Sequence, residues 1–511
     1  MSRKLSVRIL TLAVALLMLV SAAACASGSD DQPEQTTPTA DTTPAPAGDS
    51  GNSDITPPAQ DTEVELKPDL PTVDYTGQTL TFLEREIQIG SNVDVFFTEI
   101  YADISKAETV SDAVYNRNMD INQKYGIELV SVREMDAKIH DTFSKSADAG
   151  DKICDVLHAN GGTTMKLAIK GYLRDMNTLD HVNYENPWWM GMVMETTAMS
   201  GKNAFAIGDT NLQAFTAVSA IYFNKQMVED LSLDNIYPIV EEGKWTLDKM
   251  YTYSQAAVAE LDGDDKMTPN DRYGLLFNAY VWQPLFYGSG TALVEHDAAG
   301  GVFLNFKNET VMNNLTKVVD YLADDKTNAC TSWMSLGKQE DFFLSGHSMF
   351  YIQLMYSTLD MRQGELDFGI LPIPKLDESQ DGYYHYVHNK SSYTAVPKIN
   401  FDLEKTGIIL EDLAYHSYKT VRPSFFDVLL DGKVARDEES TEMLDYVYEN
   451  VYVCLLRPMT DVGLTTDNVV RSLITAKTGS GSLASTIKRA EAMWERTLNN
   501  IVKSFEEKMD E

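Results

Sequence analysis

The chain has 511 residues, of which 43% are hydrophobic and 10% aromatic, so it can bury a large core and is long enough for two domains or lobes. Its 76 acidic residues outnumber its 42 Lys and Arg residues, and the formal charge of −34 excludes the basic surface that nucleic-acid binding requires. We interpret the excess of acidic residues as a feature that keeps the protein soluble outside a cell, because molecules of like charge repel one another. Only four cysteines occur, without metal-site spacing, and Cys154, Cys330 and Cys454 are expected to be small buried side chains.

The N-terminus has the parts of a secretory signal peptide. Basic residues precede an apolar run at 9–20, and small residues lead to Cys25, so residues 1–24 are predicted to be removed on export. The run is short for a membrane span. The position of Cys25 after three alanines resembles the bacterial lipoprotein cleavage box. Either Cys25 is lipidated as the first mature residue, which we expect, or ordinary cleavage leaves a free thiol.

A polar segment separates Cys25 from the globular part of the chain. Residues 25–71 are rich in Pro, Thr, Ser, Asp and Gly and contain few apolar side chains. Such a composition cannot bury enough surface to offset the entropy of ordering, so we expect a disordered linker. A lipid anchor followed by this linker would hold the protein at the outer face of the cytoplasmic membrane.

The globular part begins with alternating strand and helix patterns. Strands are predicted at 79–83, 127–132 and 153–157, and helices at 110–125 and 136–149. This order predicts a parallel α/β sheet, in which ligands bind beyond the carboxyl ends of the strands. Asn160 and the two glycines after it follow the third strand. They favour either a ligand contact or a simple tight turn.

Further strand patterns occur at 204–207 and 217–223, and helices are predicted at 403–419 and 440–453. Between them, residues 260–271 have the spacing of an EF-hand-type calcium loop. The predicted ligands are Glu260, Asp262, Asp264, Lys266 through its carbonyl, Thr268 and Asp271. The segment departs from that pattern at three positions: it has Glu at position 1, Asp265 at position 6 and the shorter Asp at position 12. The segment is either a structural calcium site or a solvated acidic turn.

Three local motifs carry a resemblance to a known family. They are residues 220–225 (AIYFNK), which fit a strand that leads into a helix, residues 243–248 (GKWTLD), which fit a helix start, and residues 342–350 (FFLSGHSMF), which fit an element before a buried strand. All three are similar to elements of the extracellular solute-binding proteins of ABC importers, in the carbohydrate-binding group. The motifs occur in the expected order behind a lipoprotein-like signal.

This resemblance implies a two-lobed fold of the type II periplasmic-binding-protein kind, with the ligand in a cleft between two α/β lobes. By that pattern, the first lobe covers 72–201 plus 391–433 and the second covers 202–390 plus 434–511. The expected partners are a mono- or oligosaccharide and an ABC permease, with contact to the membrane through the lipid anchor alone. A monomer without a required cofactor is expected, apart from calcium as a structural ion.

A sugar site needs aromatic rings for the apolar sugar faces and planar polar groups for the hydroxyls. The resemblance implies ligand contacts at a set of residues from both lobes: Trp282, Tyr287, Gln353, Tyr356, Asn160, Asp209 and Glu84. For Trp282, Gln353 and Tyr356 a buried structural role is an equal alternative, and Asp209 also fits a turn or cap. Trp188, Trp189 and Trp245 are assigned to packing.

We predict that the protein is not an enzyme. Residues 346–350 (GHSMF) have Phe350 where a nucleophile elbow needs its last glycine, and the sequence contains no HExxH, Walker or GxGxxG motif. Carboxylates are too numerous to indicate a glycosidase pair. Two alternatives to an importer component stay open: a secreted carbohydrate-active hydrolase, and a solute-binding component of a membrane sensor.

Overall fold

The computed structural model describes residues 66–86, 99–106, 109–333, 338–361, 364–389, 391–430 and 438–510. The predicted signal peptide, Cys25 and all but the last residues of the predicted linker lie outside this part. Leu66 onward forms one compact unit. Within the described residues, no helix combines the length and apolar character that crossing a membrane requires.

The first of two main sheets has the strand order β12-β3-β1-β2. Its strands are β1 (Thr79–Glu86), β2 (Glu128–Met135), β3 (Val156–Ala159) and β12 (Tyr393–Ala395). β1 pairs in parallel with β2 and β3, and β12 is antiparallel to β3. The helices α2 (Thr109–Tyr125) and α3 (Asp136–Ala149) connect the parallel strands. The predicted alternation of strand and helix is therefore confirmed.

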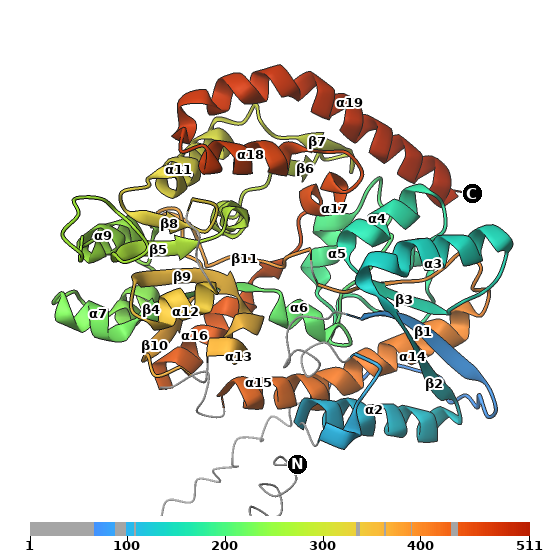
Figure 1. The fold of residues 1–511 in the computed structure, drawn as a ribbon. Helices are drawn as coiled ribbons and strands as arrows, with labels where there is room; N and C mark the ends of the chain where they lie inside the picture. Colours follow the sequence, from blue (N-terminus) through green and yellow to red (C-terminus); the bar gives the residue numbers. More distant parts are fainter. Residues whose placement is uncertain are drawn as a thin grey trace, which may run out of the picture. The chain divides into compact units, whose positions relative to one another are not determined.

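The second sheet has the order β10-β4-β9-β5-β8 and mixes parallel with antiparallel pairs. Its strands are β4 (Ser219–Asn224), β5 (Tyr273–Phe277), β8 (Asn328–Cys330), β9 (Ser348–Leu354) and β10 (Phe368–Leu371). Every residue of β4 and β5 is buried, which is why these strands have near-continuous apolar sequences. The two sheets lie on opposite sides of Figure 1.

Helices surround both sheets. Those up to residue 361 are α4 (Gly161–Ile169), α5 (Gly191–Thr197), α6 (Leu212–Thr216), α7 (Lys225–Asp230), α8 (Ile236–Glu241), α9 (Leu247–Ala257), α10 (Trp282–Tyr287), α11 (Glu309–Ala323), α12 (Gln339–Leu344) and α13 (Thr358–Met361). The later ones are α14 (Leu403–His416), α15 (Arg422–Leu430), α16 (Glu438–Glu449), α17 (Leu456–Thr460), α18 (Thr466–Thr475) and α19 (Leu483–Asp510). Two small sheets pair β6 (Val294–His296) with β7 (Val302–Leu304), and β11 (His385–Tyr386) with β13 (Val451–Tyr452).

The helix predicted at 440–453 ends earlier than expected, at Glu449. Val451 and Tyr452 instead form β13 and pair with β11. This pairing is with residues more than 60 positions away in the sequence, so local periodicity could not reveal it. Cys154, Cys330 and Cys454 are buried and unpaired, as expected.

Among the described residues, two of the segments that run between the main sheets lie side by side. The outgoing segment covers residues 204–219 and the returning one 387–395. Bridges join Ala206 to Thr394 and Val218 to Val387, and the N–H of His388 donates to the carbonyl of Ala217 (2.9 Å). We call this antiparallel pair the crossing segments.

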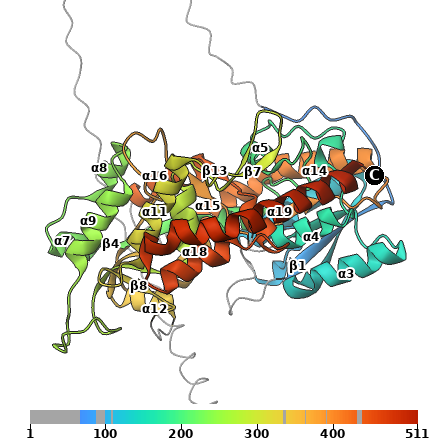
Figure 2. The same ribbon diagram turned by 90° about the horizontal axis from the view of Figure 1, so that it is seen from above.

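The long helix α19 spans the top of the molecule from α18 to α4 (Figures 1 and 2). Its 28 residues give it a length of about 42 Å. Trp494 is fully buried, packs on Phe306 (ring centroids 5.6 Å apart) and donates from its indole nitrogen to Thr465 (3.2 Å). Near its other end, Lys508 packs against Gly171, just beyond α4. The helix therefore contacts elements around both sheets.

Candidate functional site

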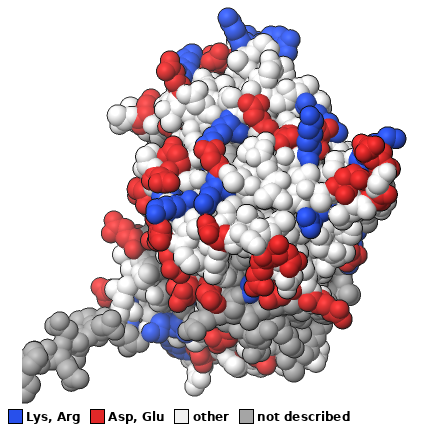
Figure 3. Space-filling view, turned by 90° about the vertical axis from the view of Figure 1, so that its left-hand side faces the viewer, with Lys and Arg blue, Asp and Glu red and all other residues white. Residues whose placement is uncertain are grey.

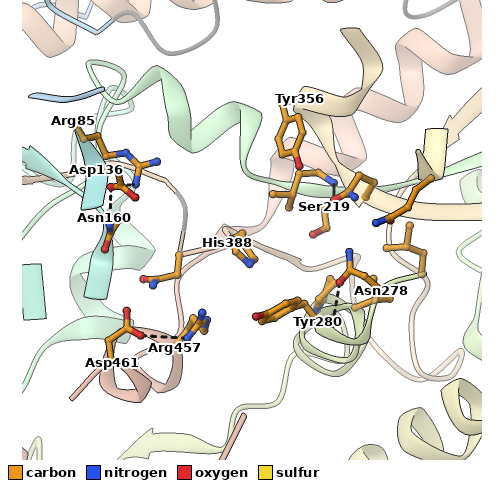
Figure 4. Close-up of a pocket in the computed structure, with 17 residues that line it drawn as sticks. Arg85, Asp136, Asn160, Ser219, Asn278, Tyr280, Tyr356, His388, Arg457 and Asp461 are labelled. Carbon is orange, nitrogen blue, oxygen red and sulfur yellow. Dashed lines mark hydrogen bonds and ion pairs between the residues drawn. The ribbon is translucent and has the colours of Figure 1, made fainter. Parts of the chain in front are cut away.

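A cavity of about 460 Å³ lies between the two sheets, at the crossing segments (Figure 4). Its floor is formed by the crossing segments themselves, through Ser219, His388 and Asn389. Residues from elements around the first sheet line one side, and residues from the second sheet and its helices line the other. A molecule in this cavity would therefore touch both halves of the protein.

On the first-sheet side, Asn160 and Asp136 are hydrogen-bonded to each other. Asn160 caps α4 by accepting from the N–H of Thr163 (2.9 Å), and its Nδ2 donates to Oδ1 of Asp136 (2.8 Å). Arg85 donates from Nη1 to the same carboxylate oxygen (3.3 Å) and from Nε to Gln213 (2.8 Å). Asn160 thus lies at the cavity, as the sequence predicted, and it is also a helix cap.

On the second-sheet side, the predicted residues Gln353 and Tyr356 line the cavity. Gln353 is at the end of β9, where its Nε2 donates to the Tyr351 hydroxyl (3.1 Å) and its Oε1 accepts from the N–H of Leu354 (3.0 Å). Tyr280 adds an aromatic ring that is 38% exposed, with the Arg471 guanidinium 4.2 Å from its centroid. Tyr280 and Tyr356 are tyrosine rings available to a ligand.

Arg457 and Asp461, on and just after α17, complete the lining. Their Nη1 and Oδ1 atoms are 3.7 Å apart. Asp461 packs against Gly162 and Asn389 against Gly161, so closely that a Cβ at either glycine would collide with these side chains. The two glycines therefore permit the approach of protein side chains, whereas the sequence suggested the approach of a ligand or a turn.

Trp282 and Tyr287 do not line the cavity, although the sequence placed ligand contacts there. Both side chains are fully buried. Trp282 donates from its indole nitrogen to Asp467 (3.0 Å), a carboxylate whose pKa is raised by burial. The neighbouring residues Tyr280, Val281 and Pro284 do line the cavity. Helical turns from η4 (Ala279–Val281) into α10 direct these residues to the cavity and Trp282 to the core.

Glu84 is also buried and does not line the cavity. It is 5% exposed and accepts from the N–H groups of Ile100 (2.9 Å) and Tyr101 (3.1 Å), and from the Ser131 hydroxyl. Trp188 and Trp189 donate to Glu411 (2.9 and 2.7 Å), and Trp245 donates to the carbonyl of Pro372 (3.1 Å). All three tryptophans are buried, in agreement with their assignment to packing.

A buried polar network ties the first sheet to both crossing segments. Glu99 accepts from the N–H of Gln213 (3.2 Å) on the outgoing segment and from the hydroxyl of Ser392 on the returning one. Its Oε2 is 3.1 Å from Nδ1 of His158, whose Nε2 contacts the Thr394 hydroxyl (3.1 Å). Arg117 donates to the Glu99 carbonyl (2.5 Å). The network fixes the floor of the cavity without entering it.

Asp209 is buried away from this cavity, where it faces Arg422 with 3.6 Å between Oδ2 and Nη1. Arg422 in turn lies over the ring of Phe215 (5.4 Å). Burial raises the pKa of Asp209 to about 7, against the opposing effect of Arg422. Asp209 therefore lies between packed elements, and its carboxyl group has a structural role.

The acidic loop brings part of its predicted ligand set together. Carboxylate oxygens of Glu260, Asp262 and Asp264 lie within 4.8 Å of one another. Asp265, at the position where an EF-hand has glycine, adopts the left-handed conformation (φ 62°). Asp271 is fully buried, and its two oxygens accept from the N–H groups of Leu261 and Thr268 (both 2.7 Å). Asp271 therefore closes the loop onto its own backbone.

Several solved structures share this architecture. A cyclo/maltodextrin-binding protein in complex with maltotetraose is 15% identical, covers 88% of this chain and 99% of its own, and has a TM-score of 0.51. A sugar transporter protein from Rhizobium etli in an open conformation is 14% identical (84% and 99% covered, TM-score 0.53). UspC of M. tuberculosis is 12% identical (82% and 100% covered, TM-score 0.53). No protein-family model matches the sequence, and no curated protein sequence does.

The chain has the two-lobed fold of periplasmic binding proteins. The first sheet and its helices form the first lobe, and the second sheet and its helices form the second. The cavity is thus the cleft between the lobes. The sequence missed Arg85 and Asp136, although Arg85 lies at the carboxyl end of β1 and Asp136 directly follows β2, and the rule for parallel sheets could have identified them. For Arg457 and Asp461, which come from a distant C-terminal helix, the sequence gave no local signal.

The raised pKa of Asp209 predicts a specific pH dependence of stability. The unfolded chain loses this proton near the ordinary value of 3.8 and the folded protein near 7, so stability falls as pH rises between those values. Asp209→Asn does not have this loss. Its free energy of unfolding is therefore expected to rise by roughly 2–4 kcal/mol relative to that of wild type between pH 4 and pH 7. Urea unfolding across this range measures the difference, with exposed Asp69→Asn as control. Parallel profiles for wild type and Asp209→Asn would contradict the assignment.

Proposed function

We propose that the protein is the solute-binding component of an ABC importer and captures a mono- or oligosaccharide in the cleft between its lobes. The observation that carries the proposal is the lining of the cleft by both lobes and both crossing segments. A ligand held there favours the closed arrangement of the lobes, because only that arrangement lets it contact both. Closure would present the loaded protein to a membrane permease.

The chemistry of the lining supports a sugar. The rings of Tyr280 and Tyr356 provide flat apolar surfaces for the C–H faces of a pyranose. Amide groups of Asn278, Gln353 and Asn389 surround them, and each can both donate and accept a hydrogen bond. The neighbours of the same fold include proteins solved with maltotetraose and described as sugar transporters. We propose that the sugar is bound and released unchanged.

The proposal predicts that sugar binding depends on Tyr356 and not on Trp282. Tyr356→Ala removes a ring from the cleft and is expected to weaken the affinity by about 1–3 kcal/mol while leaving the melting temperature nearly unchanged. Trp282→Ala opens a cavity in the core and is expected to lower the unfolding free energy by about 3–5 kcal/mol, with normal affinity in the molecules that remain folded. Calorimetric titration and urea unfolding of the same two variants measure both effects.

The sugar is found first by a thermal-shift screen of mono- and oligosaccharides, since a ligand of the native state alone raises its stability. Chromatography of the sugars after incubation tests for turnover. If no sugar binds the wild type, or if bound sugars are hydrolysed, the proposed function is wrong. If Trp282→Ala loses affinity and Tyr356→Ala does not, the ligand is bound elsewhere than in this cleft.

We further propose that the protein is exported and anchored through a lipid on Cys25, as a monomer on the outer face of the cytoplasmic membrane. The support is the signal-like sequence before Cys25 and the polar composition of residues 25–71. Cys25→Ala is expected to move the protein from the membrane fraction to the soluble fraction after cell lysis. Immunoblotting of the two fractions measures this. Equal membrane association of wild type and variant would contradict the lipid anchor.

We also propose that the acidic loop binds calcium as a structural ion. The convergence of Glu260, Asp262 and Asp264 supports it, since calcium prefers several carboxylate oxygens. Calcium is expected to raise the melting temperature of the wild type and to leave that of the double variant Asp262→Asn, Asp264→Asn unchanged. Scanning calorimetry with calcium and with chelator measures this, and exposed Glu507→Gln serves as control. An unchanged wild-type melting curve would mean that the loop is an acidic turn.

A further inference from the structure

Among the described residues, four charged side chains line the cleft, and they form two pairs of opposite sign. Arg85 is paired with Asp136 and Arg457 with Asp461 (Figure 4). We propose that this balance makes the cleft selective for uncharged polyhydroxylated ligands, so that sugar acids and amino sugars are rejected. The inference rests on the proposed function and specifies the class of sugar that the cleft accepts.

The pair in the first lobe is held rigidly. The Arg85 side chain is 1% exposed, and Gln213 accepts from its Nε (2.8 Å). Asp136 uses Oδ1 for both Arg85 and Asn160, whereas its Oδ2 has no hydrogen-bond partner among the described residues. Its side chain is 42% exposed and lies at the cleft. The pair thus offers a ligand a fixed hydrogen-bond acceptor beside a guanidinium.

The second pair has hydrogen-bonding groups that the described part of the protein leaves unused. Arg457 makes no hydrogen bond there, and its Nε is buried without a partner. Its Nη1 is 3.7 Å from Asp461, which is too long for a hydrogen bond. Asn389, 6% exposed, has a buried Oδ1 that also has no partner in the described ranges. Buried polar groups of this kind are costly unless a ligand satisfies them.

A sugar hydroxyl both donates and accepts, so neighbouring hydroxyls can donate to Asp136 or Asn389 and accept from Arg457. A carboxylate on the ligand would satisfy Arg457 but would place a second negative charge beside Asp461 or Asp136. An ammonium group on the ligand would likewise place a second positive charge beside Arg85 or Arg457. Closure of the cleft excludes water, and each unbalanced charge then costs more than it would in solution.

The first test compares matched ligands at about pH 6, where carboxylates and amines are both charged. Calorimetric titration is carried out with glucose, galactose and mannose, with the uronate of each, and with the 2-amino-2-deoxy derivative of each. Any di- or oligosaccharide that the wild type binds is compared with its own acidic and amino forms. The neutral member of a binding set is expected to bind at least about 10-fold more tightly than both charged members.

The second test removes one charge at a time. Asp461→Asn leaves Arg457 unbalanced and is expected to raise the affinity for the uronate relative to the neutral sugar by about 10-fold or more. Arg457→Gln leaves Asp461 unbalanced and is expected to shift the preference toward the amino sugar. Lys307→Gln and Glu495→Gln serve as controls. They remove one positive and one negative charge from an exposed ion pair that does not line the cleft, in which Nζ and Oε1 are 3.2 Å apart.

The outcomes separate this inference from the proposed function. If no sugar of any charge binds, the proposed function itself is wrong. If sugars bind but a uronate or an amino sugar binds the wild type as tightly as its neutral parent, the inference is overturned while sugar binding stands. It is also overturned if Asp461→Asn and Arg457→Gln leave the preference unchanged in folded protein, or if the surface variants shift it equally.

Discussion

The organisation of the molecule depends on the antiparallel crossing segments and on the buried network that fixes them to the first lobe. Glu99 contacts the outgoing segment through Gln213 and the returning segment through Ser392, and His158 contacts the returning segment through Thr394. A buried carboxylate is costly unless its oxygens are paired and hydrogen-bonded. Loss of either segment from the first lobe would leave Glu99 without these partners, so both segments are held in one register at the floor of the cleft.

The charges of the cleft are arranged differently from those of the protein surface. The whole chain carries a formal charge of −34, and acidic and basic side chains are interspersed over the face seen in Figure 3. Charges on such a solvated surface are screened over about 8–10 Å at physiological salt. Inside the cleft, the charged side chains of the described residues lie beside partners of opposite sign, Arg85 beside Asp136 and Arg457 beside Asp461. The compensation is local because solvent screening there is weak.

The candidate site was predictable only where a residue is tied to the end of a regular element. Asn160 follows β3, so the rule about strand ends placed it at the cleft, whereas Gln353, next to the last residue of β9, was placed there by the family resemblance. In the segment that begins at Val281, the sequence placed ligand contacts at Trp282 and Tyr287, but the ring that lines the cleft is that of Tyr280, one residue before this segment. Trp282 faces the core and Tyr280 the cleft. Residue type alone could not decide this, because a large aromatic ring suits both environments.

The sequence by itself determined the α/β class and the strand–helix alternation from 79 to 157, because these follow from local periodicity and apolar content. Only the tertiary structure decided which charges meet. Asp461 reaches Gly162 and β13 pairs with β11 across long separations in the chain, and no local pattern encodes such contacts. Arg457 and Asp461 enter the cleft through such contacts, so they became identifiable only once both lobes and their crossing segments were in place.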